Sequence, residues 1–312
     1  MNAVNAESLG KLFLSYPYKK YQLAVQKIQP ETIAAYYANR ALRASCIKYT
    51  AGEDKSLSAV ITIEKSHTLS QSFGFPIAFV TNFICSDTQN YHAILSSAKD
   101  ILDGYFLICR QPADNTAAVN ALQKCGFYYV CTETVYTLDL DTQPQYSNDN
   151  FSRIRPCTED DLDKVRTIAE NEHTDIRFYF DPYFPREKTA RFFSETIVRS
   201  FNNPSHRVFV YDGDNGPAGF ITSIHNKGLS EICGRGYGSL DYIAVDRSYQ
   251  KTHAGYALNN YALEDLRRGG CSVVSVKTMG SNYRAMRLLQ KNKFIPTSHN
   301  IILHRTHTFD CG

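Results

Sequence analysis

The sequence predicts a mixed α/β protein made of two similar halves, of which only the second is complete. Three observations support this class. Residues Ser239–Ala262 read as a strand, a polar turn and a helix. Residues Cys271–His304 then read as strand, helix and strand, and the helix of that segment recurs at Asn115–Phe127. Strands that alternate with helices favour a sheet with helices packed on its faces.

The stretch Ser239–Ala262 organises the second half. Leu240–Val245 is an almost unbroken apolar run, as expected for a strand covered on both faces. Asp246–Lys251 is polar, and the apolar residues that follow recur at helical spacing until Gly269-Gly270. Such a junction presents free backbone N–H groups and the positive end of a helix dipole. We therefore expect a phosphate or pyrophosphate to bind here.

Neither GxGxxG nor GxxxxGK[ST] occurs here, which argues against a Rossmann fingerprint or a P-loop. The stretch instead resembles motif A of the GNAT acetyltransferases. Ile243-Ala244-Val245 matches the end of the family's strand, Gln250 its Gln/Arg position and Gly255 its last glycine. His253 departs from the pattern because it replaces the first glycine. It can offer its N–H if its φ stays negative. An ordinary βα unit is the alternative for this stretch alone.

A second motif lies at Gly280–Phe294 and resembles the last helix of the same family. The matching residues are Asn282, Ala285, Leu288 and Phe294. Two positions depart from the family pattern. Leu289 stands where many relatives carry a tyrosine that protonates the departing thiolate, and Lys293 stands where a glycine is usual.

The resemblance implies an acetyl-CoA-dependent N-acetyltransferase and a set of cofactor-binding residues. These are Ile243, Val245, Gln250, Lys251, Thr252, His253, Ala254, Gly255, Tyr256 and Asn282. Acetyl transfer to an amine needs a proton acceptor and N–H donors for the oxyanion. The Val245 amide is the expected donor and Asp241 the candidate base, with a strand-end carboxylate paired with an arginine as the alternative. Tyr283 could replace the missing tyrosine as catalytic acid.

Composition excludes several classes of function. The 312 residues are 43% hydrophobic and 21% charged, with a formal net charge of +3 and no run of Lys and Arg longer than a pair. These values describe a globular protein and do not favour nucleic acid as a partner. No segment approaches the roughly 18 apolar residues of a membrane span, and no secretory leader is recognised. Nine dispersed cysteines without CxxC predict reduced thiols, no metal site and a cytoplasmic protein.

The first half carries weaker signals. A helix is predicted near Gln29–Ala41, with a proline at its start. The further predictions are a strand at Ser58–Glu64, strand–turn–strand at Ser70–Phe83, a helix at His92–Leu102 and a strand at Gly104–Arg110.

An internal repeat closes this half. Asn115–Phe127 aligns with Asn282–Phe294 without a gap, and each copy lies between two predicted strands. This indicates two GNAT-like halves, although chance similarity of two amphipathic helices is the alternative. No counterpart of the turn Gln250–Gly255 precedes residue 110, so we expect no cofactor in the first half.

These patterns predict a truncated GNAT-like domain at residues 1–140, a linker at 141–150 and an acetyl-CoA-binding domain at 151–312. The linker is polar and carries proline and asparagine. The second domain begins with a strand at Ser152–Arg155 and a capping box at Thr158, and it includes a hairpin around Asp212–Gly216.

The paired halves resemble the branch of the superfamily that acetylates dTDP-4-amino-4,6-dideoxyhexoses, the dTDP-fucosamine acetyltransferases. This implies a small-molecule amine as acceptor and, as substrate-binding residues, Arg177, Phe178, Tyr179 and Tyr183. A hydrophobic lid for the aromatic residues and a surface salt bridge for the arginine are the alternatives. Another amine (amino acid, antibiotic or protein N-terminus) and a catalytically silent acyl-CoA-binding module are rival functions. A homodimer is left open.

Overall fold

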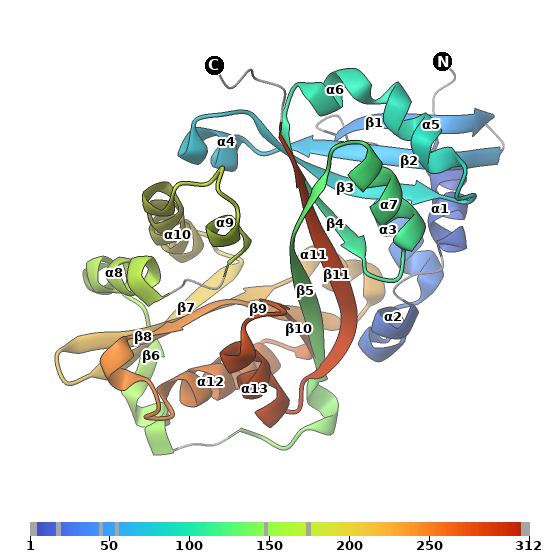
Figure 1. Cartoon of the computed structure of the whole chain (residues 1–312). Coiled ribbons are helices and arrows are strands. Elements are labelled where there is room, and N and C mark those ends of the chain that lie inside the picture. The colour runs from blue at the N-terminus through green and yellow to red at the C-terminus, as the bar shows by residue number, and fades with distance from the viewer. Residues whose placement is uncertain are drawn as a thin grey trace. The chain divides into compact units, whose positions relative to one another are not determined.

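The structure is a computed structural model that describes residues 5–16, 20–43, 46–53, 56–146, 149–172 and 176–306. Its contacts divide the chain into two units. The first comprises residues 1–133 and 298–312, and the second residues 134–297. The elements of both are labelled in Figure 1. Among the described residues, no helix is long and apolar enough to cross a membrane.

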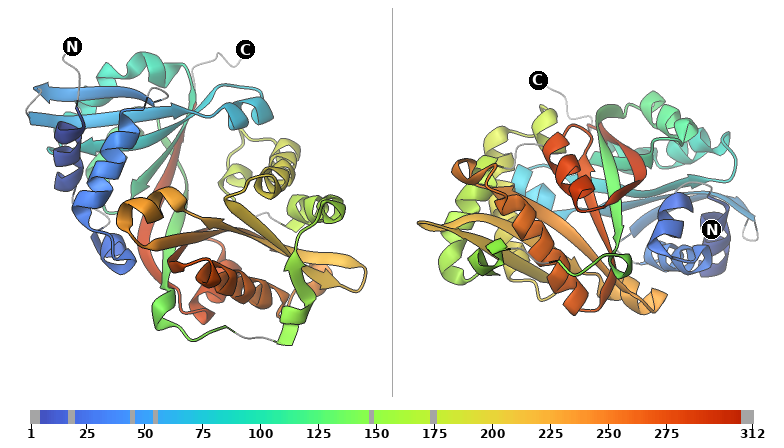
Figure 2. Two further views of the ribbon diagram at one scale, coloured as in Figure 1. Left: turned by 180° about the vertical axis from the view of Figure 1, so that it is seen from behind. Right: turned by 90° about the horizontal axis from the view of Figure 1, so that it is seen from below.

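The first unit is a sheet with helices on both faces. Helices α5 and α7 cover one face and helices α1 and α3 the other, each over its own apolar cluster (Figures 1 and 2). The strand order is β1-β2-β3-β4-β11-β5. The elements are α1 (Ala6–Ser15), α2 (Lys20–Gln26), α3 (Pro30–Ala41), β1 (Cys46–Glu53), β2 (Ser56–Lys65), α4 (His67–Phe73), β3 (Ile77–Cys85), α5 (Asn90–Ser97), α6 (Lys99–Asp103), β4 (Phe106–Pro112), α7 (Thr116–Lys124), β5 (Tyr128–Asp139) and β11 (Ile295–Arg305).

Most predicted elements of this unit are confirmed, but the first strand of the predicted pair at residues 70–83 is wrong. This segment begins as helix α4. The Ser66 side chain accepts a hydrogen bond from the Leu69 N–H, and Gly74 ends the helix in the left-handed conformation. Leu69 and Phe73 lie four residues apart, so both face the interior from one side of the helix.

The second unit has the same layered design. Helices α12 and α13 lie over one apolar cluster of its sheet, and helices α8 and α10 over the cluster on the other face. The strand order is β5-β10-β9-β8-β7-β6. Its further elements are η1 (Leu140–Thr142), η2 (Asp149–Arg153), β6 (Ile154–Pro156), η3 (Glu159–Asp161), α8 (Leu162–Glu172), α9 (Arg177–Phe180), α10 (Arg186–Phe201), β7 (His206–Gly213), β8 (Gly216–His225), α11 (Lys227–Cys233), β9 (Gly236–Val245), η4 (Arg247–Tyr249), α12 (Ala254–Arg268), β10 (Cys271–Met279) and α13 (Tyr283–Lys291).

Helix α12 is fixed against the sheet by its buried face. Leu258, Leu263 and Leu266 are fully buried. Each such side chain contributes about 1.5–3 kcal/mol by leaving water. This buried face holds the start of α12 beside the end of β9.

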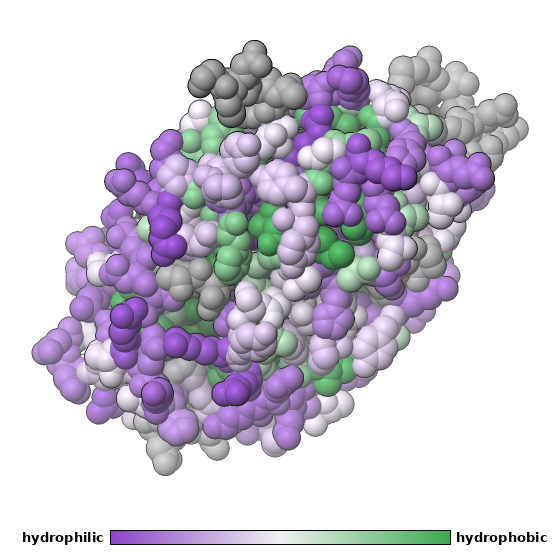
Figure 3. Space-filling model, viewed as in Figure 1, coloured by the Kyte–Doolittle hydropathy of each residue, from purple (hydrophilic) through white to green (hydrophobic). Residues whose placement is uncertain are grey.

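Hydrophilic residues cover most of the face drawn in Figure 3, with hydrophobic residues in smaller patches between them.

The division into units differs from the predicted boundaries. β5 runs from the first unit into the second, and β11 runs back, so residues 134–150 belong to the second unit and residues 298–312 to the first. In the first unit, β11 pairs antiparallel with β4. In the second, β5 occupies the place beside β10. Each unit thus includes part of a strand from the other half of the sequence.

The internal repeat extends well beyond the helix that the sequence revealed. Helices α4 and α11 share an N-cap side chain and a left-handed glycine at the C-terminus. In each half the following strand, β3 or β9, pairs in parallel with its neighbour β4 or β10. Each strand also skips one residue in its antiparallel register with β2 or β8, Thr81 in β3 and Asp241 in β9. Chance similarity of two helices does not produce these shared irregularities.

The ends of α7 and α13 are also equivalent. Asn115 and Asn282 cap the two helices through hydrogen bonds from Ala118 N–H and Ala285 N–H. After each helix one residue adopts a positive φ, Gly126 at 85° and Lys293 at 64°. A residue other than glycine pays a conformational cost of about 1–2 kcal/mol in this region. The second half therefore retains the turn that follows α7 in the first half but forms it with a strained lysine.

Replacement of Lys293 by glycine should stabilise the protein. Removal of the Cβ relieves the left-handed strain, offset partly by the greater freedom of glycine in the unfolded chain, and we expect a gain of about 1 kcal/mol in the free energy of unfolding. Urea denaturation measures it. The matched control is Gly126→Ala, whose Cβ would meet Arg305 Nε at 3.6 Å, an ordinary contact. It should lose about 1 kcal/mol from backbone strain. A less stable Lys293→Gly variant would contradict the equivalence.

Candidate functional site

Strands β9 and β10 separate at the centre of the second unit. They pair in parallel as far as Leu240 and Val276, and β9 then continues to Val245 without a partner on that side. On its other side, β9 remains paired with β8, but Thr222 lies opposite Tyr242 and Ser223 opposite Leu240. Asp241 is therefore the extra residue of a β-bulge. Bulges bend a strand and increase its twist, which accounts for the separation from β10.

The separated part of β9 directs backbone polar groups into the space beside it. Asp246 N–H donates to Ala218 O on β8 at 2.8 Å. Successive residues of an antiparallel strand alternate in direction, so the N–H and C=O groups of Ile243 and Val245 point away from β8. They face the side where β10 no longer pairs. The predicted oxyanion donor, the Val245 amide, has this orientation.

The turn after β9 is held by hydrogen bonds at both ends. Asp246 Oδ1 accepts from Ser248 N–H at 2.9 Å, which starts η4. The Tyr249 hydroxyl accepts from Asp214 N–H in the β7–β8 hairpin at 2.7 Å. Thr252 Oγ1 donates to Tyr249 O at 2.6 Å. These contacts position the residues that lead into α12.

The residues before α12 form a cluster of N–H groups. The first backbone hydrogen bond of the helix joins Ala257 N–H to His253 O, and in the part of the chain that the structure describes no acceptor is found for the amides of residues 253–256. Lys251 and His253 have φ values of 70° and 66°. Left-handed residues before a right-handed helix create a concave set of N–H groups that suits an anion.

The sequence made a negative φ at His253 the condition for offering its N–H, and this condition is not met, because φ is 66°. The N–H nevertheless has no acceptor among the described residues. The histidine is nonetheless exposed, so its ring does not fill the concavity. Exposed cations stand around it: the side chain of Arg247 is 85% accessible, and Lys251 and Arg284 are also exposed. The local charge therefore favours an anion.

Asp241 is exposed at the bulge. Among the described residues it has no ion-pair or hydrogen-bond partner, so the alternative of a carboxylate paired with an arginine is not what the structure contains. Its equivalent in the first unit, Thr81, lies with its hydroxyl 2.8 Å from that of Thr62. The bulge residue of the first unit, Thr81, thus has a hydroxyl that is hydrogen-bonded within the protein, whereas that of the second unit, Asp241, has an accessible carboxylate.

Tyr242 lies between the bulge and the segment around α9. Its hydroxyl donates to Ala169 O at 3.3 Å, and burial, together with the neighbouring Tyr179 and Asp241, raises its pKa well above the usual value of 10. The phenol therefore stays neutral. Because both neighbours affect it, Tyr179 and Asp241 are brought to the same part of the second unit.

The four predicted substrate residues have different environments. Phe178 is only 2% exposed, and its ring packs 4.7 Å from Phe184, so its assignment to a substrate is wrong: it is a core residue. The Arg177 guanidinium lies 4.6 Å from the Phe178 ring. Tyr179 is half-buried, with Arg186 5.0 Å above its ring. Tyr183 is 45% exposed.

The two predicted residues of helix α13 lie at its N-terminal end. The Asn282 carbonyl oxygen caps the helix by accepting from Ala285 N–H at 3.0 Å, a structural role that Asn115 shares in the first unit. Tyr283 is 71% exposed, in the first turn of the helix. Leu289 lies in the apolar core, where a tyrosine hydroxyl would need a polar partner.

Two residues of this site were not predicted from the sequence. Glu172 Oε2, at the end of α8, accepts from Gln250 Nε2 at 2.9 Å. Arg284 Nη1, on α13, donates to Gln250 Oε1 at 3.1 Å. They contact the turn from elements 78 and 34 residues away in the chain, and no local pattern marks them.

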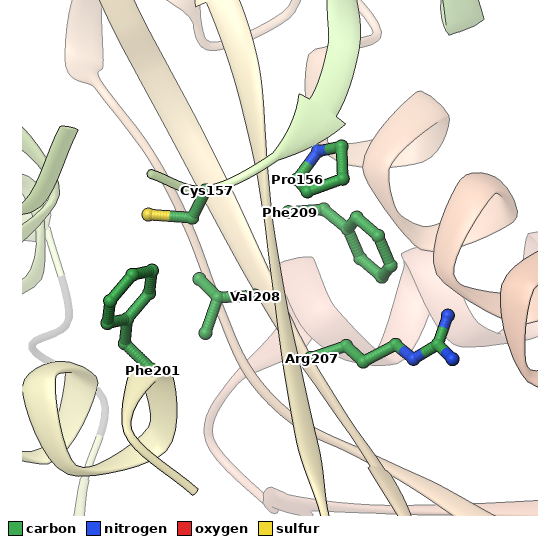
Figure 4. Close-up of a pocket in the computed structure, with 6 residues that line it drawn as sticks. All are labelled: Pro156, Cys157, Phe201, Arg207, Val208 and Phe209. Carbon is green, nitrogen blue, oxygen red and sulfur yellow. The ribbon is translucent and has the colours of Figure 1, made fainter. Parts of the chain in front are cut away.

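A separate pocket of about 290 Å³ lies beside β6 and β7 and does not involve the β9–α12 junction. It is lined by Pro156, Cys157, Phe201, Arg207, Val208 and Phe209. In Figure 4, Cys157 and Phe201 lie on the same side of β7 as Val208, and Arg207 and Phe209 on the other. Burial raises the pKa of the Cys157 thiol to about 12, and Arg207 pairs with Asp265 at 2.6 Å. The pocket offers neither a thiolate nor an unpaired cation.

No group of three or more His, Cys, Asp or Glu side chains is placed to hold a metal ion in the described parts of the chain. The polar groups at the β9–α12 junction are instead backbone amides, one carboxylate and scattered cations. Such a site can hold a phosphorylated carrier along the strand and can accept a proton at Asp241.

Comparison with solved structures shows the fold. A GCN5-related N-acetyltransferase from Sphaerobacter thermophilus aligns with a TM-score of 0.57 at 12% identity, over 96% of this chain and 92% of its own. A tandem GNAT protein from the clavulanic acid biosynthesis pathway gives 0.57 at 12%, over 98% and 96%. A GCN5-related N-acetyltransferase from Kribbella flavida gives 0.54 at 12%, over 88% and 95%. The architecture is therefore that of a tandem GNAT protein.

No curated protein sequence matches this chain. The family model for the acetyltransferase (GNAT) family does match, over residues 169–294. That range includes the hairpin, the bulged strand β9, the turn, α12 and α13. This part of the second unit is therefore similar in sequence to the GNAT acetyltransferase family.

Proposed function

We propose that this protein transfers an acetyl group from acetyl-CoA to a primary amine of a small molecule, and that this amine belongs to a nucleotide-activated amino sugar. The observation that supports acetyl transfer is the combination of the separated strand β9 with the free amides before α12. The separated strand can bind an extended chain, and the free amides can bind an anion. The two lie next to each other along the chain, as a pyrophosphate with an attached acyl arm requires.

Gly255 provides a test of fit for acetyl-CoA. It has an ordinary negative φ, and an added Cβ would meet its nearest neighbour, Val245 Cγ2, at 3.7 Å. Nothing in the protein itself therefore requires a glycine, although glycine destabilises a helix relative to alanine. A group outside the chain that approaches this backbone explains why glycine occupies the position.

The residues then have separate roles. Acetyl-CoA supplies an activated thioester when it is bound. The amides of residues 253–256 hold its pyrophosphate, with Arg247 and Lys251 beside them. The Val245 N–H would donate to the thioester oxygen as negative charge develops there. Asp241 would accept a proton from the attacking amine, directly or through a water, as the new C–N bond replaces the C–S bond. Leu289 leaves this site without the usual tyrosine, so coenzyme A would depart as a thiolate that takes its proton from solvent or from Tyr283, the only phenol in the first turn of α13.

The acceptor class is supported by the segment around α9. Phe180 and Tyr183 are 48% and 45% exposed, and Arg186 stands next to Tyr179. Exposed aromatic rings can stack on a base or cover a sugar face, and an arginine can bind a diphosphate. Tyr179 and Asp241 share Tyr242 as a neighbour, which connects this segment with the base.

A panel of amines distinguishes the proposals. Thiol release from acetyl-CoA should be measured with a dTDP-4-amino-4,6-dideoxyhexose, amino acids, aminoglycosides and a peptide with a free N-terminus. We expect turnover with the nucleotide sugar. Turnover with the peptide alone would refute the acceptor class. Binding of acetyl-CoA by calorimetry without turnover on any amine would favour a silent acyl-CoA-binding module.

Substitution Gly255→Ala should separate stability from cofactor binding. Since alanine meets no clash and favours the helix, the free energy of unfolding should rise by about 0.5–1 kcal/mol. The methyl group should block the approach of the pyrophosphate, and the dissociation constant of CoA should rise about tenfold or more. Urea denaturation and calorimetry measure the two effects. Gly228→Ala, a helical glycine with open space around its Cβ position, is the control for stability alone. A Gly255→Ala variant with unchanged CoA binding would contradict the assigned pyrophosphate seat.

Substitution Asp241→Asn should slow acetyl transfer while CoA binding is retained. Loss of a general base lowers kcat/KM by about 10²–10⁴-fold. The amide of the variant cannot accept a proton from the amine, so the loss should appear in the rate of acetyl transfer and not in the affinity for CoA. The control Asp214→Asn changes the same charge at a hairpin residue whose side chain is 80% exposed. An unchanged rate in Asp241→Asn would show that the base lies elsewhere.

A further inference from the structure

The side chain of Gln250 is held by partners from three different elements of the second unit. Its Nε2 donates to Glu172 Oε2 on α8 at 2.9 Å and to the Val245 carbonyl at the end of β9 at 3.3 Å. Its Oε1 accepts from Arg284 Nη1 on α13 at 3.1 Å. An amide side chain carries donors at one end and an acceptor at the other. The carboxylate and the guanidinium therefore fix which end faces the strand.

The Val245 carbonyl is the acceptor that a ligand in the separated strands would use. It points away from β8, toward the side where β10 no longer pairs, as the bond from Asp246 N–H to Ala218 O requires. An acyl-CoA arm contains amide N–H groups that need acceptors of this kind. In the structure, the Gln250 side chain already occupies this acceptor.

Glu172 strengthens the contact between the Gln250 amide and the Val245 carbonyl by accepting a second hydrogen bond from Gln250 Nε2. Its side chain is only 14% exposed, and its second oxygen lies 3.9 Å from Arg247 Nε. A hydrogen bond to an ionised carboxylate is about twice as strong as one between neutral groups. Glu172 is also an acidic side chain close to the free amides that would bind a pyrophosphate. A carboxylate would repel a phosphate, so the position of Glu172 is explained by its hydrogen bond with Gln250.

We propose that Gln250 acts as a latch on the cofactor groove. In the free protein its amide occupies the Val245 carbonyl, and it releases this carbonyl to an amide N–H of acyl-CoA when the cofactor enters. Glu172 and Arg284 are positioning residues that set the strength of the latch. On release, Arg284 loses its bond to Gln250 and can turn toward the phosphates. The inference rests on the proposed function, because it assumes that acyl-CoA binds along β9.

The test compares CoA binding in four variants by calorimetry at 0.15 M salt. Gln250→Met keeps the length of the side chain but cannot donate a hydrogen bond. Glu172→Gln weakens the hold on Gln250, and Glu170→Gln makes the same charge change at an exposed residue of α8. The fourth variant combines Gln250→Met with Glu172→Gln. In the wild-type protein, the side-chain amide signal of Gln250 in a nitrogen–proton NMR spectrum, assigned by its absence from Gln250→Met, should shift when CoA is added.

The latch makes specific predictions for these variants. Gln250→Met should lower the dissociation constant of CoA by about threefold to tenfold, since one competing hydrogen bond is removed. Glu172→Gln should also tighten binding, while Glu170→Gln should change it less than about twofold. The double variant should bind no more tightly than Gln250→Met, because both changes act through one contact.

Two outcomes would overturn the latch, and a third would overturn the proposed function as well. Equal or weaker CoA binding by Gln250→Met would show that the side chain supports the cofactor instead of competing with it. Additive effects in the double variant would show that Glu172 acts only through its charge. If wild-type protein binds no CoA at all, the proposed function itself is wrong. Wild-type binding without a tighter variant refutes the latch alone.

Discussion

The extra residue in β9 is the constraint on which the rest of the second unit depends. Because Asp241 has no partner in the register with β8, the strand bends and leaves β10 after Leu240. The separation leaves the backbone polar groups of Ile243 and Val245 without pairing to β10. The bulge residue itself carries the carboxylate, so one irregularity of the backbone positions both the separated strand and the candidate base.

The first unit shows which of these features belong to the architecture and which to the chemistry. It retains the bulge, the parallel strand pair and the capped helix after it. At the bulge, however, Thr81 is satisfied by Thr62. The amide of Asn115 is fully buried, 3.1 Å from the Tyr91 hydroxyl. The first unit therefore keeps the backbone design while its polar side chains bond to one another. In the second unit the corresponding carboxylate of Asp241 has no hydrogen-bond or ion-pair partner among the described residues.

The turn before α12 combines opposite electrostatic demands. Its free amides and the cations around it favour an anion, yet the carboxylate of Glu172 lies close by and holds Gln250. The buried leucines of α12 and the hydrogen bond from Asn292 to Asn259, 2.7 Å long, keep α12 and α13 in place beside the turn. The proposed latch therefore requires only side-chain rearrangement at Gln250 and Arg284, with the two helices unmoved.

The sequence by itself determined the features that depend on neighbouring residues. The apolar run of β9, the polar turn and α12 all follow from short-range patterns, and the repeat of the last helix was visible as aligned residues. Only the tertiary structure decided the bulge at Asp241, the passage of β5 and β11 between the two units, the burial of Phe178 and the contacts of Gln250 with Glu172 and Arg284. These features depend on strand register and on packing between segments far apart in the chain, and no local pattern of residues encodes either.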